Sequence, residues 1–276
     1  MIGTEKKRQL LHAVRLCRRC PTARSRLAGY LGGEPHAGEG CWDASVVFLG
    51  LAPGTGFQKR VMETGPGTDY IEKRMEVQGW THGPRYFPFL FEHFRDPLVR
   101  LVAPEAPGRQ LHQHLFFWTD LSRCPMGVTA NGRAVRAAEI PACRDFLRRT
   151  LELVEPRLVV IVGKETSRLV RRYRLLELTE TGSAARLARG ILVCGQLEAD
   201  YISVPQPGYV ARFVKAKDRP ALLQRMGQVF TGWVLAIHRK RGLLKPKLSE
   251  PPCGLHPRCA RTGGLPGPGG GPGAAP

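Results

Sequence analysis

Two short apolar runs limit most strongly what this chain can fold into. They read Ser45-Val-Val-Phe-Leu-Gly50 and Leu158-Val-Val-Ile-Val-Gly163, and each ends at a glycine. Continuous apolar runs of this length are typical of strands buried on both faces, whereas a membrane-spanning helix needs roughly 18 apolar residues or more. The sequence therefore predicts buried parallel strands and no transmembrane segment.

Strand and helix patterns alternate along the chain between these runs and beyond them. This alternation predicts a layered α/β fold with a largely parallel sheet. The expected helices cover residues 4–30, 69–79, 87–95, 137–154, 165–176 and 220–239, and the expected strands cover 46–49, 115–119 and 158–162, with two more inside 190–204.

The two ends of the chain differ in composition from its middle. The first residues are polar and lack the apolar core and small-residue cleavage site of a signal peptide, which predicts an intracellular protein. Glycine and proline dominate the sequence after Pro251, and such a composition cannot bury a core. We therefore expect one domain over residues 1–245 and a disordered tail over residues 246–276.

The chain carries a large excess of positive charge. It contains 42 Lys and Arg against 23 Asp and Glu, which gives a formal net charge of +19, and one of its arginine clusters runs from Arg168 to Arg174. Cationic side chains that neutralise phosphates release counterions, so this balance suits a polyanionic partner. A coding bias toward Arg, Ala, Gly and Pro is the alternative explanation.

Four cysteines form the most informative set of candidate ligands. Cys17 and Cys20 are spaced as a C-x-x-C pair, and Cys124 and Cys143 stand far along the chain. A C-x-x-C pair brings two thiolates to one metal centre, and two distant cysteines can complete four soft ligands for an iron-sulfur cluster or a zinc ion. Four buried thiols that act as small apolar residues are the alternative.

Five segments in order resemble the motifs of the iron-sulfur uracil-DNA glycosylases. The C-x-x-C pair matches the N-terminal one of that family, and Gly50-Leu-Ala-Pro-Gly54 resembles its first active-site motif, G-E-A-P-G. Thr119-Asp-Leu-Ser-Arg-Cys-Pro125, with Asn131-Gly-Arg133 and Glu139-Ile-Pro-Ala-Cys143, resembles its T-N-x-x-K-C-x-P, N-R and E-x-x-x-C block. Gln206-Pro-Gly-Tyr-Val-Ala-Arg212 resembles its second active-site motif, H-P-x-Y-x-x-R.

The resemblance implies a fold, a cofactor and a partner. The fold is a three-layer α/β/α arrangement around a mostly parallel, four-stranded sheet, and the cofactor is a 4Fe-4S cluster held by Cys17, Cys20, Cys124 and Cys143. The partner is DNA, contacted by a monomer that lies in the cytoplasm of a prokaryotic-type cell and associates with the nucleoid. The base and DNA contacts would come from Gly50, Ala52, Pro53, Gly54, Pro207, Gly208, Tyr209 and Arg212, and the phosphate-facing edge would include Arg18, Arg19, Arg123 and Arg133.

Three departures from the family pattern bear on the mechanism. Leu51 stands where the first motif has its water-positioning acid, and it cannot accept a proton. Asp120 replaces the uracil-reading Asn, and an ionised carboxylate only accepts hydrogen bonds, which disfavours ordinary uracil. Gln206 replaces the His that stabilises the leaving base; its amide donates a hydrogen bond but carries no positive charge.

The resulting hypothesis is an enzyme of DNA base-excision repair. It would hydrolyse the N-glycosidic bond of uracil or of another deaminated or damaged base after flipping that base out of the stack, with Asp120 and Gln206 as the candidate catalytic residues. Asp120 is either a carboxylate relocated to a neighbouring strand end or the reader of a base edge that offers an amino donor. The alternative is an inactive nucleic-acid-binding or damage-sensing protein that kept the fold and the cluster, because fold alone does not fix function.

Overall fold

A computed structural model describes residues 2–21, 39–40, 42–52, 97, 100–101, 116–124, 137–206 and 214–243. The chain divides into two units, Met1–Leu244 and Lys245–Pro276, and every described residue lies in the first unit. The helices predicted at 69–79 and 87–95 and the predicted disordered tail lie outside the described residues. None of the helices in the described part is long and apolar enough to cross a membrane.

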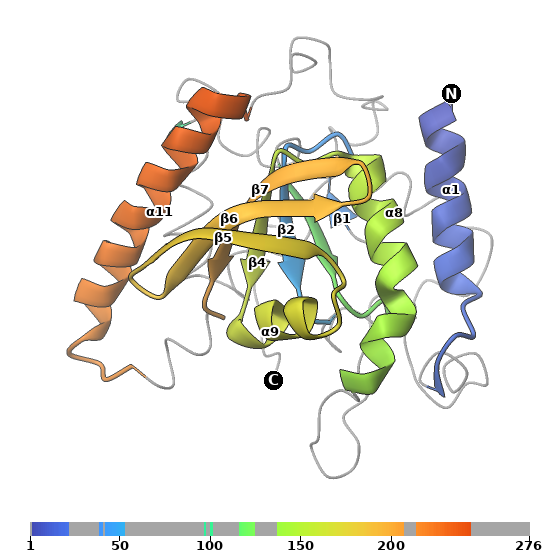
Figure 1. Cartoon of the computed structure of the whole chain (residues 1–276), viewed down its shortest axis with the longest axis horizontal. Helices are drawn as coiled ribbons and strands as arrows, with labels where there is room; N and C mark the ends of the chain where they lie inside the picture. Colours follow the sequence, from blue (N-terminus) through green and yellow to red (C-terminus); the bar gives the residue numbers. More distant parts are fainter. Residues whose placement is uncertain are drawn as a thin grey trace, which may run out of the picture. The chain divides into compact units, whose positions relative to one another are not determined.

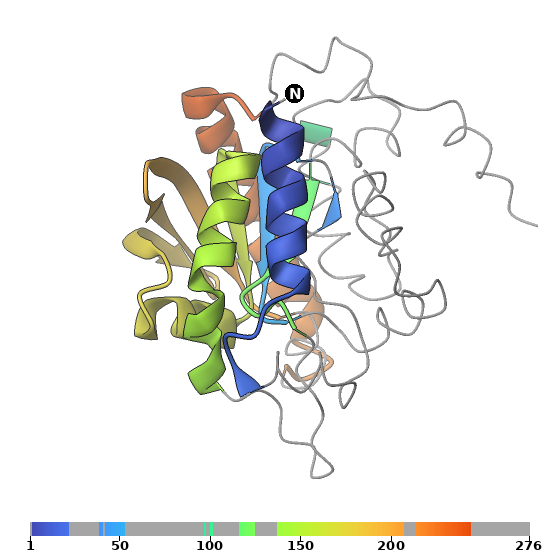
Figure 2. The same ribbon diagram turned by 90° about the vertical axis from the view of Figure 1, so that its right-hand side faces the viewer.

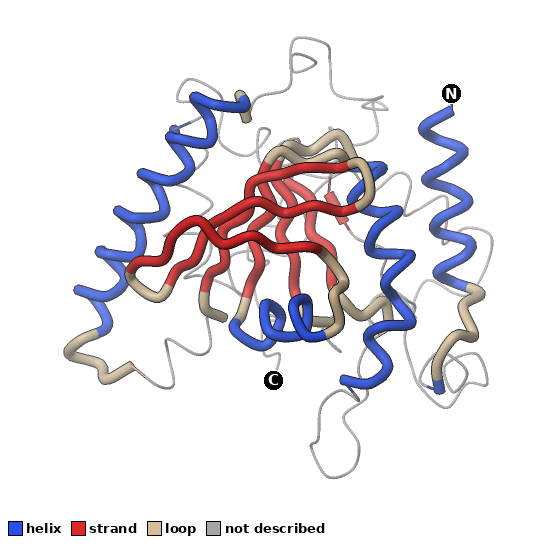
Figure 3. Tube along the Cα trace, viewed as in Figure 1, coloured by secondary structure: helices blue, strands red, loops and turns tan. Residues whose placement is uncertain are grey.

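The described elements alternate as the sequence predicts (Figures 1 and 3). The strands are β1 (Glu39–Gly40), β2 (Val46–Gly50), β3 (Phe116–Asp120), β4 (Leu158–Val162), β5 (Glu177–Ala184), β6 (Leu187–Cys194) and β7 (Leu197–Val204). The helices are α1 (Ile2–Arg15), the 3-10 helix η2 (Ala137–Cys143), α8 (Arg144–Val154), α9 (Lys164–Arg172) and α11 (Arg219–Arg241).

One sheet contains all of these strands, in the order β1-β3-β2-β4-β7-β6-β5. The central strands β3, β2, β4 and β7 are mutually parallel, while β6, β5 and β1 pair antiparallel. The predicted α/β class is confirmed, but the predicted strand number of four is wrong, because the β5–β6 hairpin and β1 extend the sheet. The sequence did not reveal β5, since it is largely exposed and lacks the apolar run by which we located the other strands.

Each face of the sheet is covered by helices, which completes three layers (Figures 1 and 2). Val47 and Leu49 of β2 pack in one core cluster with residues of α1, α8 and α9. Val46 and Phe48, the alternate residues of the same strand, pack in a second cluster with residues of α11. Because successive strand residues point to opposite faces, one apolar run supplies both cores.

All four predicted helices in the described part differ from the structure, since the helix predicted at 165–176 is α9 (Lys164–Arg172) and that predicted at 220–239 is α11 (Arg219–Arg241). The helix predicted over residues 4–30 ends at Arg15, so Cys17 and Cys20 lie in the loop after α1 rather than within the helix. The helix predicted over 137–154 is divided into η2, which contains Pro141, and α8. A proline ring excludes a regular α-helical turn around it, which explains the division at this point.

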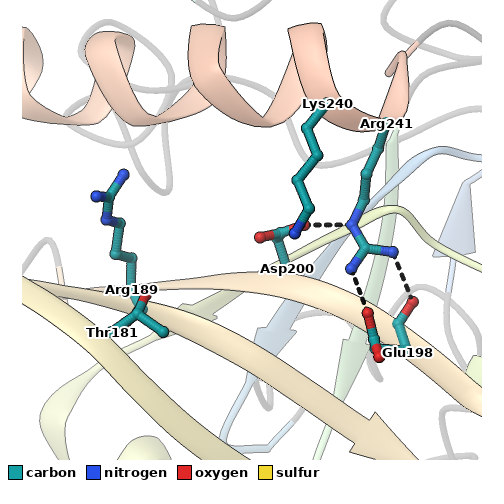
Figure 4. Close-up of polar contacts among 6 residues, drawn as sticks. All are labelled: Thr181, Arg189, Glu198, Asp200, Lys240 and Arg241. Carbon is teal, nitrogen blue, oxygen red and sulfur yellow. Dashed lines mark hydrogen bonds and ion pairs between the residues drawn. The ribbon is translucent and has the colours of Figure 1, made fainter.

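The C-terminal end of α11 is fixed to β7 by ion pairs (Figure 4). Arg241 donates from Nε to Asp200 and from Nη2 to Glu198 Oε1 over 2.7 Å, and Lys240 Nζ lies 3.7 Å from Asp200 Oδ2. Asp200 pairs in register with Leu158, the first residue of β4. This network therefore lies at the amino edge of the parallel strands, beside a cavity of about 360 Å³ under α11.

Candidate functional site at the carboxyl edge of the sheet

The parallel strands bring the predicted catalytic residues to one edge of the sheet. Gly50 and Asp120 end β2 and β3 and are register partners, and Gln206 follows the end of β7 by two residues. Figure 1 shows β2 and β4 ending on the side where α9 lies. In open α/β sheets the crevice outside the carboxyl ends of the strands is the usual ligand site, which makes this edge the candidate site.

The Asp120 side chain is held in a fixed, buried position at this edge. It is 2% exposed, and its Oδ1 accepts a hydrogen bond from Trp118 Nε1 at 3.3 Å. A Cβ atom added at Gly50 would overlap Oδ1 and lie 3.0 Å from Cζ2 of Trp118. The carboxylate therefore occupies the space that a side chain at position 50 would fill, and Gly50 is required here for close approach rather than for backbone freedom.

The loops after β2 and β3 are tied together by backbone hydrogen bonds. Leu121 N donates to Gly50 O and Ser122 N donates to Leu51 O, each at 3.0 Å. Leu51 is partly buried against the core cluster shared by α1 and α8, and Ala52 is also partly buried. Residue 51, where the resemblance predicts an acid, is thus a core-packing side chain, and Asp120 is a buried carboxylate that the described residues place at this edge.

Arg123 lies under the site rather than on a phosphate-facing surface. Its guanidinium is 1% exposed and donates to Thr119 Oγ1 and, over 3.0 Å, to Thr150 Oγ1 of α8. Burial lowers the pKa of Arg123 to about 10, and the charges of Cys143 and Asp120 oppose that shift. The predicted placement of Arg123 among the phosphate contacts is therefore wrong, and at neutral pH this residue is a buried cation that compensates Asp120.

The four predicted cysteine ligands come together from three separate segments. Cys20 and Cys124 form one buried cluster, against which Cys17 packs. Cys143, the last residue of η2, is also buried and interacts electrostatically with Cys17, Cys20 and Arg123. Cys17, Cys20, Cys124 and Cys143 form no disulfide. The structure thus brings together thiols from segments far apart in the sequence. An ion pair between Arg19 and Asp145, which are 126 residues apart, joins two of the same segments.

Backbone amides donate hydrogen bonds to two of the sulfur atoms of this cysteine site. Arg19 N donates to Cys17 Sγ at 3.5 Å, and the backbone N–H of Arg123 donates to the Cys143 sulfur. Burial raises the pKa of the Cys143 thiol, whereas the Arg123 amide and guanidinium act in the opposite direction. Among the described residues, no three His, Cys, Asp or Glu side chains converge closely enough to hold a single metal ion.

Gln206 lies at the other end of the same edge. Its side chain is exposed, and its Cβ lies 3.6 Å from the position that a Cβ at Gly163 would take. Gly163 has a φ of 100° and precedes α9, so a glycine is needed for the turn from β4 into that helix. The predicted contacts at Pro53, Gly54, Pro207, Gly208, Tyr209, Arg133 and Arg212 lie outside the described residues.

Comparison with known families agrees with this arrangement. The family model of the uracil DNA glycosylase superfamily matches residues 37–228, which is more than half of the chain. The chain belongs to the uracil DNA glycosylase superfamily. No curated protein matches the sequence.

Membership of the uracil DNA glycosylase superfamily gives the candidate site a chemical context. The superfamily generally comprises glycosylases that act on DNA, and the matched region contains Gly50, Asp120 and Gln206. Cys17 and Cys20 precede that region, whereas Cys124 and Cys143 lie within it. The sequence did not reveal the roles of Trp118 and Gly163. Trp118 donates to Asp120 and Gly163 lies beside Gln206, and these contacts depend on strand register rather than on a local sequence pattern.

Proposed function

We propose that this protein is a DNA N-glycosylase in which Asp120 replaces the water-positioning acid of the first motif. The observation that carries the proposal is the position of the Asp120 carboxylate. It is buried, it accepts a hydrogen bond from Trp118, and it occupies the space that a side chain at Gly50 would fill. A fixed, partly desolvated carboxylate at a strand end is suited to general-base work. The superfamily match and the net charge of +19 support DNA as the substrate.

The spacing of the strands supports a nucleotide-sized site between the two candidate catalytic residues. Asp120 ends β3 and Gln206 follows β7, and these two strands are three steps apart in the strand order. At about 4.8 Å a step, these strand ends are separated by about 14 Å. A base flipped out of the helix and seated over β2 and β4 would thus have the carboxylate on one side and the amide on the other.

The reaction follows from these positions. Asp120 accepts a proton from a water molecule, whose oxygen forms a bond to C1′ of the sugar as the N-glycosidic bond breaks. The bonding electrons leave with the base, and the Gln206 amide donates a hydrogen bond to that developing anion. A neutral amide stabilises an anion less than a cationic His does, so we expect this enzyme to favour bases that leave more readily than uracil.

The proposal is tested with labelled oligonucleotides that carry uracil, hypoxanthine, xanthine or oxidised bases, in single and double strands, scored for abasic sites. We expect cleavage of at least one base, a large loss in Asp120→Asn, and a smaller loss in Gln206→Ala. Asp200→Asn is the matched control, since Asp200 is also buried but lies at the opposite edge of the sheet. Full activity in Asp120→Asn would refute the assigned role.

We also propose that the cysteine site holds a 4Fe-4S cluster with a structural role. Four thiols, three of them buried, are the donor set such clusters use, and Cys17 and Cys143 each receive a backbone N–H donor. A single zinc ion needs all four sulfurs about 2.3 Å from one point, whereas a four-iron cluster is larger and its ligands stand farther apart. Iron, sulfide and zinc analysis of the purified protein therefore distinguishes the cluster from the zinc alternative.

The cluster would tie the loop after α1 to the loop after β3 and to the start of α8. Anaerobically purified protein should be brown and contain iron and sulfide. The colour and the iron should be lost in Cys124→Ser and kept in Cys194→Ser, because Cys194 is buried away from the cysteine site. Colourless protein that contains zinc would refute the cluster without touching the role of Asp120.

A damage-binding protein without catalysis is the second candidate function. It is favoured by one observation, the packing of Leu51 into the core at the position of the usual acid. Tight binding to one modified duplex with no abasic product from any base would select it. In either case we infer a cytoplasmic monomer associated with the nucleoid, and sedimentation of the purified chain with and without DNA tests its oligomeric state.

A further inference from the structure

A group of cations lies where the end of α9 meets the start of α8. Arg144, the first residue of α8, donates from Nη2 to the backbone oxygen of Tyr173. The guanidinium of Arg172 lies 5.6 Å from the centre of the Tyr173 ring, and Arg174 follows directly. These three arginine side chains are exposed, and we call Arg144, Arg172 and Arg174 the arginine patch.

The arginines of α8 and α9 differ in whether a carboxylate neutralises them. Arg168 is paired with Glu165 at 2.5 Å, and Arg148 with Glu152 at 3.6 Å. Arg171 is paired with Glu180 at 3.0 Å. Within the part of the chain that the structure describes, the three arginines of the patch form no ion pair within 4 Å. The patch is thus a concentration of positive charge without an ion-paired carboxylate, although Glu165 lies near enough to Arg172 to interact with its charge.

The patch lies at a fixed distance from the candidate active site. Helix α9 begins one residue after Gly163, whose added Cβ would lie 3.6 Å from the Gln206 Cβ, and it ends at Arg172. Nine residues of helix span about 13 Å at 1.5 Å a residue. Since successive phosphates of one strand are about 3.4 Å apart along the duplex axis, this distance corresponds to about four nucleotides.

We propose that the arginine patch binds DNA backbone phosphates about four nucleotides to one side of the flipped base. The inference rests on the proposed function, which places the flipped base between Asp120 and Gln206. The Tyr173 contacts hold Arg144 and Arg172 together, so the guanidinium groups face the backbone with less rotational freedom to lose on binding. Guanidinium groups suit phosphate recognition because they can donate two parallel hydrogen bonds.

The experiment compares two double variants that remove the same formal charge. Arg172→Gln with Arg174→Gln removes two cations that form no ion pair within 4 Å among the described residues, and Arg144 is left intact because it adjoins Cys143. The control, Arg148→Gln with Arg168→Gln, removes two cations that are paired within their helices. Binding is measured between about 50 and 200 mM salt on a duplex with a central tetrahydrofuran abasic-site analogue, so that no knowledge of the excised base is needed.

We expect the patch variant to lower the slope of log affinity against log salt by about 1.8, since each phosphate contact contributes about 0.9. Between about 50 and 200 mM salt, the factor by which affinity falls would then be about twelve times smaller for the patch variant than for the unaltered protein. The control variant should keep a nearly unchanged slope. The analogue is then moved to about two base pairs from one end of the duplex or from the other. At one of these ends the phosphates that the patch would contact are absent, so there the patch variant should bind like the unaltered protein; at the other end it should bind more weakly.

Equal slopes in both variants would overturn the inference, because the effect would then reflect net charge alone. An unchanged slope in the patch variant, with normal binding and cleavage by the unaltered protein, would overturn the inference and leave the proposed function standing. Failure of the unaltered protein to bind the duplex at low salt would overturn the proposed function instead, and the inference with it. Thermal unfolding of both variants checks that each keeps its fold.

Discussion

The close contact between Gly50 and Asp120 makes Gly50→Ala the most informative single substitution. The new methyl group would overlap the carboxylate oxygen and lie 3.0 Å from Trp118 Cζ2. The carboxylate would have to move, and it would lose the indole hydrogen bond at 3.3 Å. Overpacking of a buried site costs about 1–3 kcal/mol, and a broken hydrogen bond to a charged group about 1.5–3 kcal/mol. We therefore expect a loss of about 2.5–6 kcal/mol in the free energy of unfolding.

A double-mutant cycle measured by denaturant unfolding isolates this contact. Asp120→Ala removes the overlapping oxygen, so Gly50→Ala should cost much less in that background than in the unaltered chain, with a coupling of about 1–3 kcal/mol. Gly232→Ala on α11 is the matched control, because nothing lies within 4 Å of its added Cβ. That change should stabilise the protein by about 0.5–1 kcal/mol, as alanine favours a helix over glycine. An equal cost of Gly50→Ala in both backgrounds would refute the steric reasoning.

Three further predictions concern other parts of the fold. Arg123→Lys should lower the free energy of unfolding by about 2 kcal/mol or more, since two buried hydroxyl groups lose their donor. Gly190→Ala should prevent stable folding, because its Cβ would overlap the backbone of Thr179, whereas Gly182→Ala on the same hairpin meets only an ordinary contact; circular dichroism distinguishes them. Burial raises the pKa of Cys194 from 9.0 to about 11, so as the pH rises the unfolded chain loses the thiol proton before the folded chain does. The free energy of unfolding should therefore fall between pH 9 and 11, and it should fall less in Cys194→Ala.

The central strands were predictable from the sequence because their signal is local. The strand predicted at 158–162 coincides with β4. The strand predicted at 46–49 ends one residue before β2 does, and the strand predicted at 115–119 is displaced from β3 by one residue at both ends. A continuous apolar run is buried on both faces in almost any parallel sheet, so neighbouring residues suffice to recognise it. Strand β5 was missed for the same reason, since its polar residues carry no such run.

Boundaries that depend on packing were harder to predict. The helix expected to continue to residue 30 ends at Arg15, where the chain turns to bring Cys17 and Cys20 toward Cys124. The placement of Arg123 was wrong because an arginine in a loop is usually exposed, whereas here two threonines and the charges around it allow burial. Such compensation comes from distant segments and leaves no pattern in the nearby sequence.

The sequence by itself determined the chemistry that the chain contains. It contains the four thiols and the match to the superfamily, and its resemblance to the active-site motifs predicts that Leu51 and Gln206 stand where those motifs have an acid and a His. The tertiary structure alone decided that Asp120 is buried against Gly50 and that Arg172 and Arg174 lack the carboxylate partners that Arg168 and Arg148 have. The physical reason is that strand register and helix packing set these distances, and both arise from contacts between residues far apart in the chain.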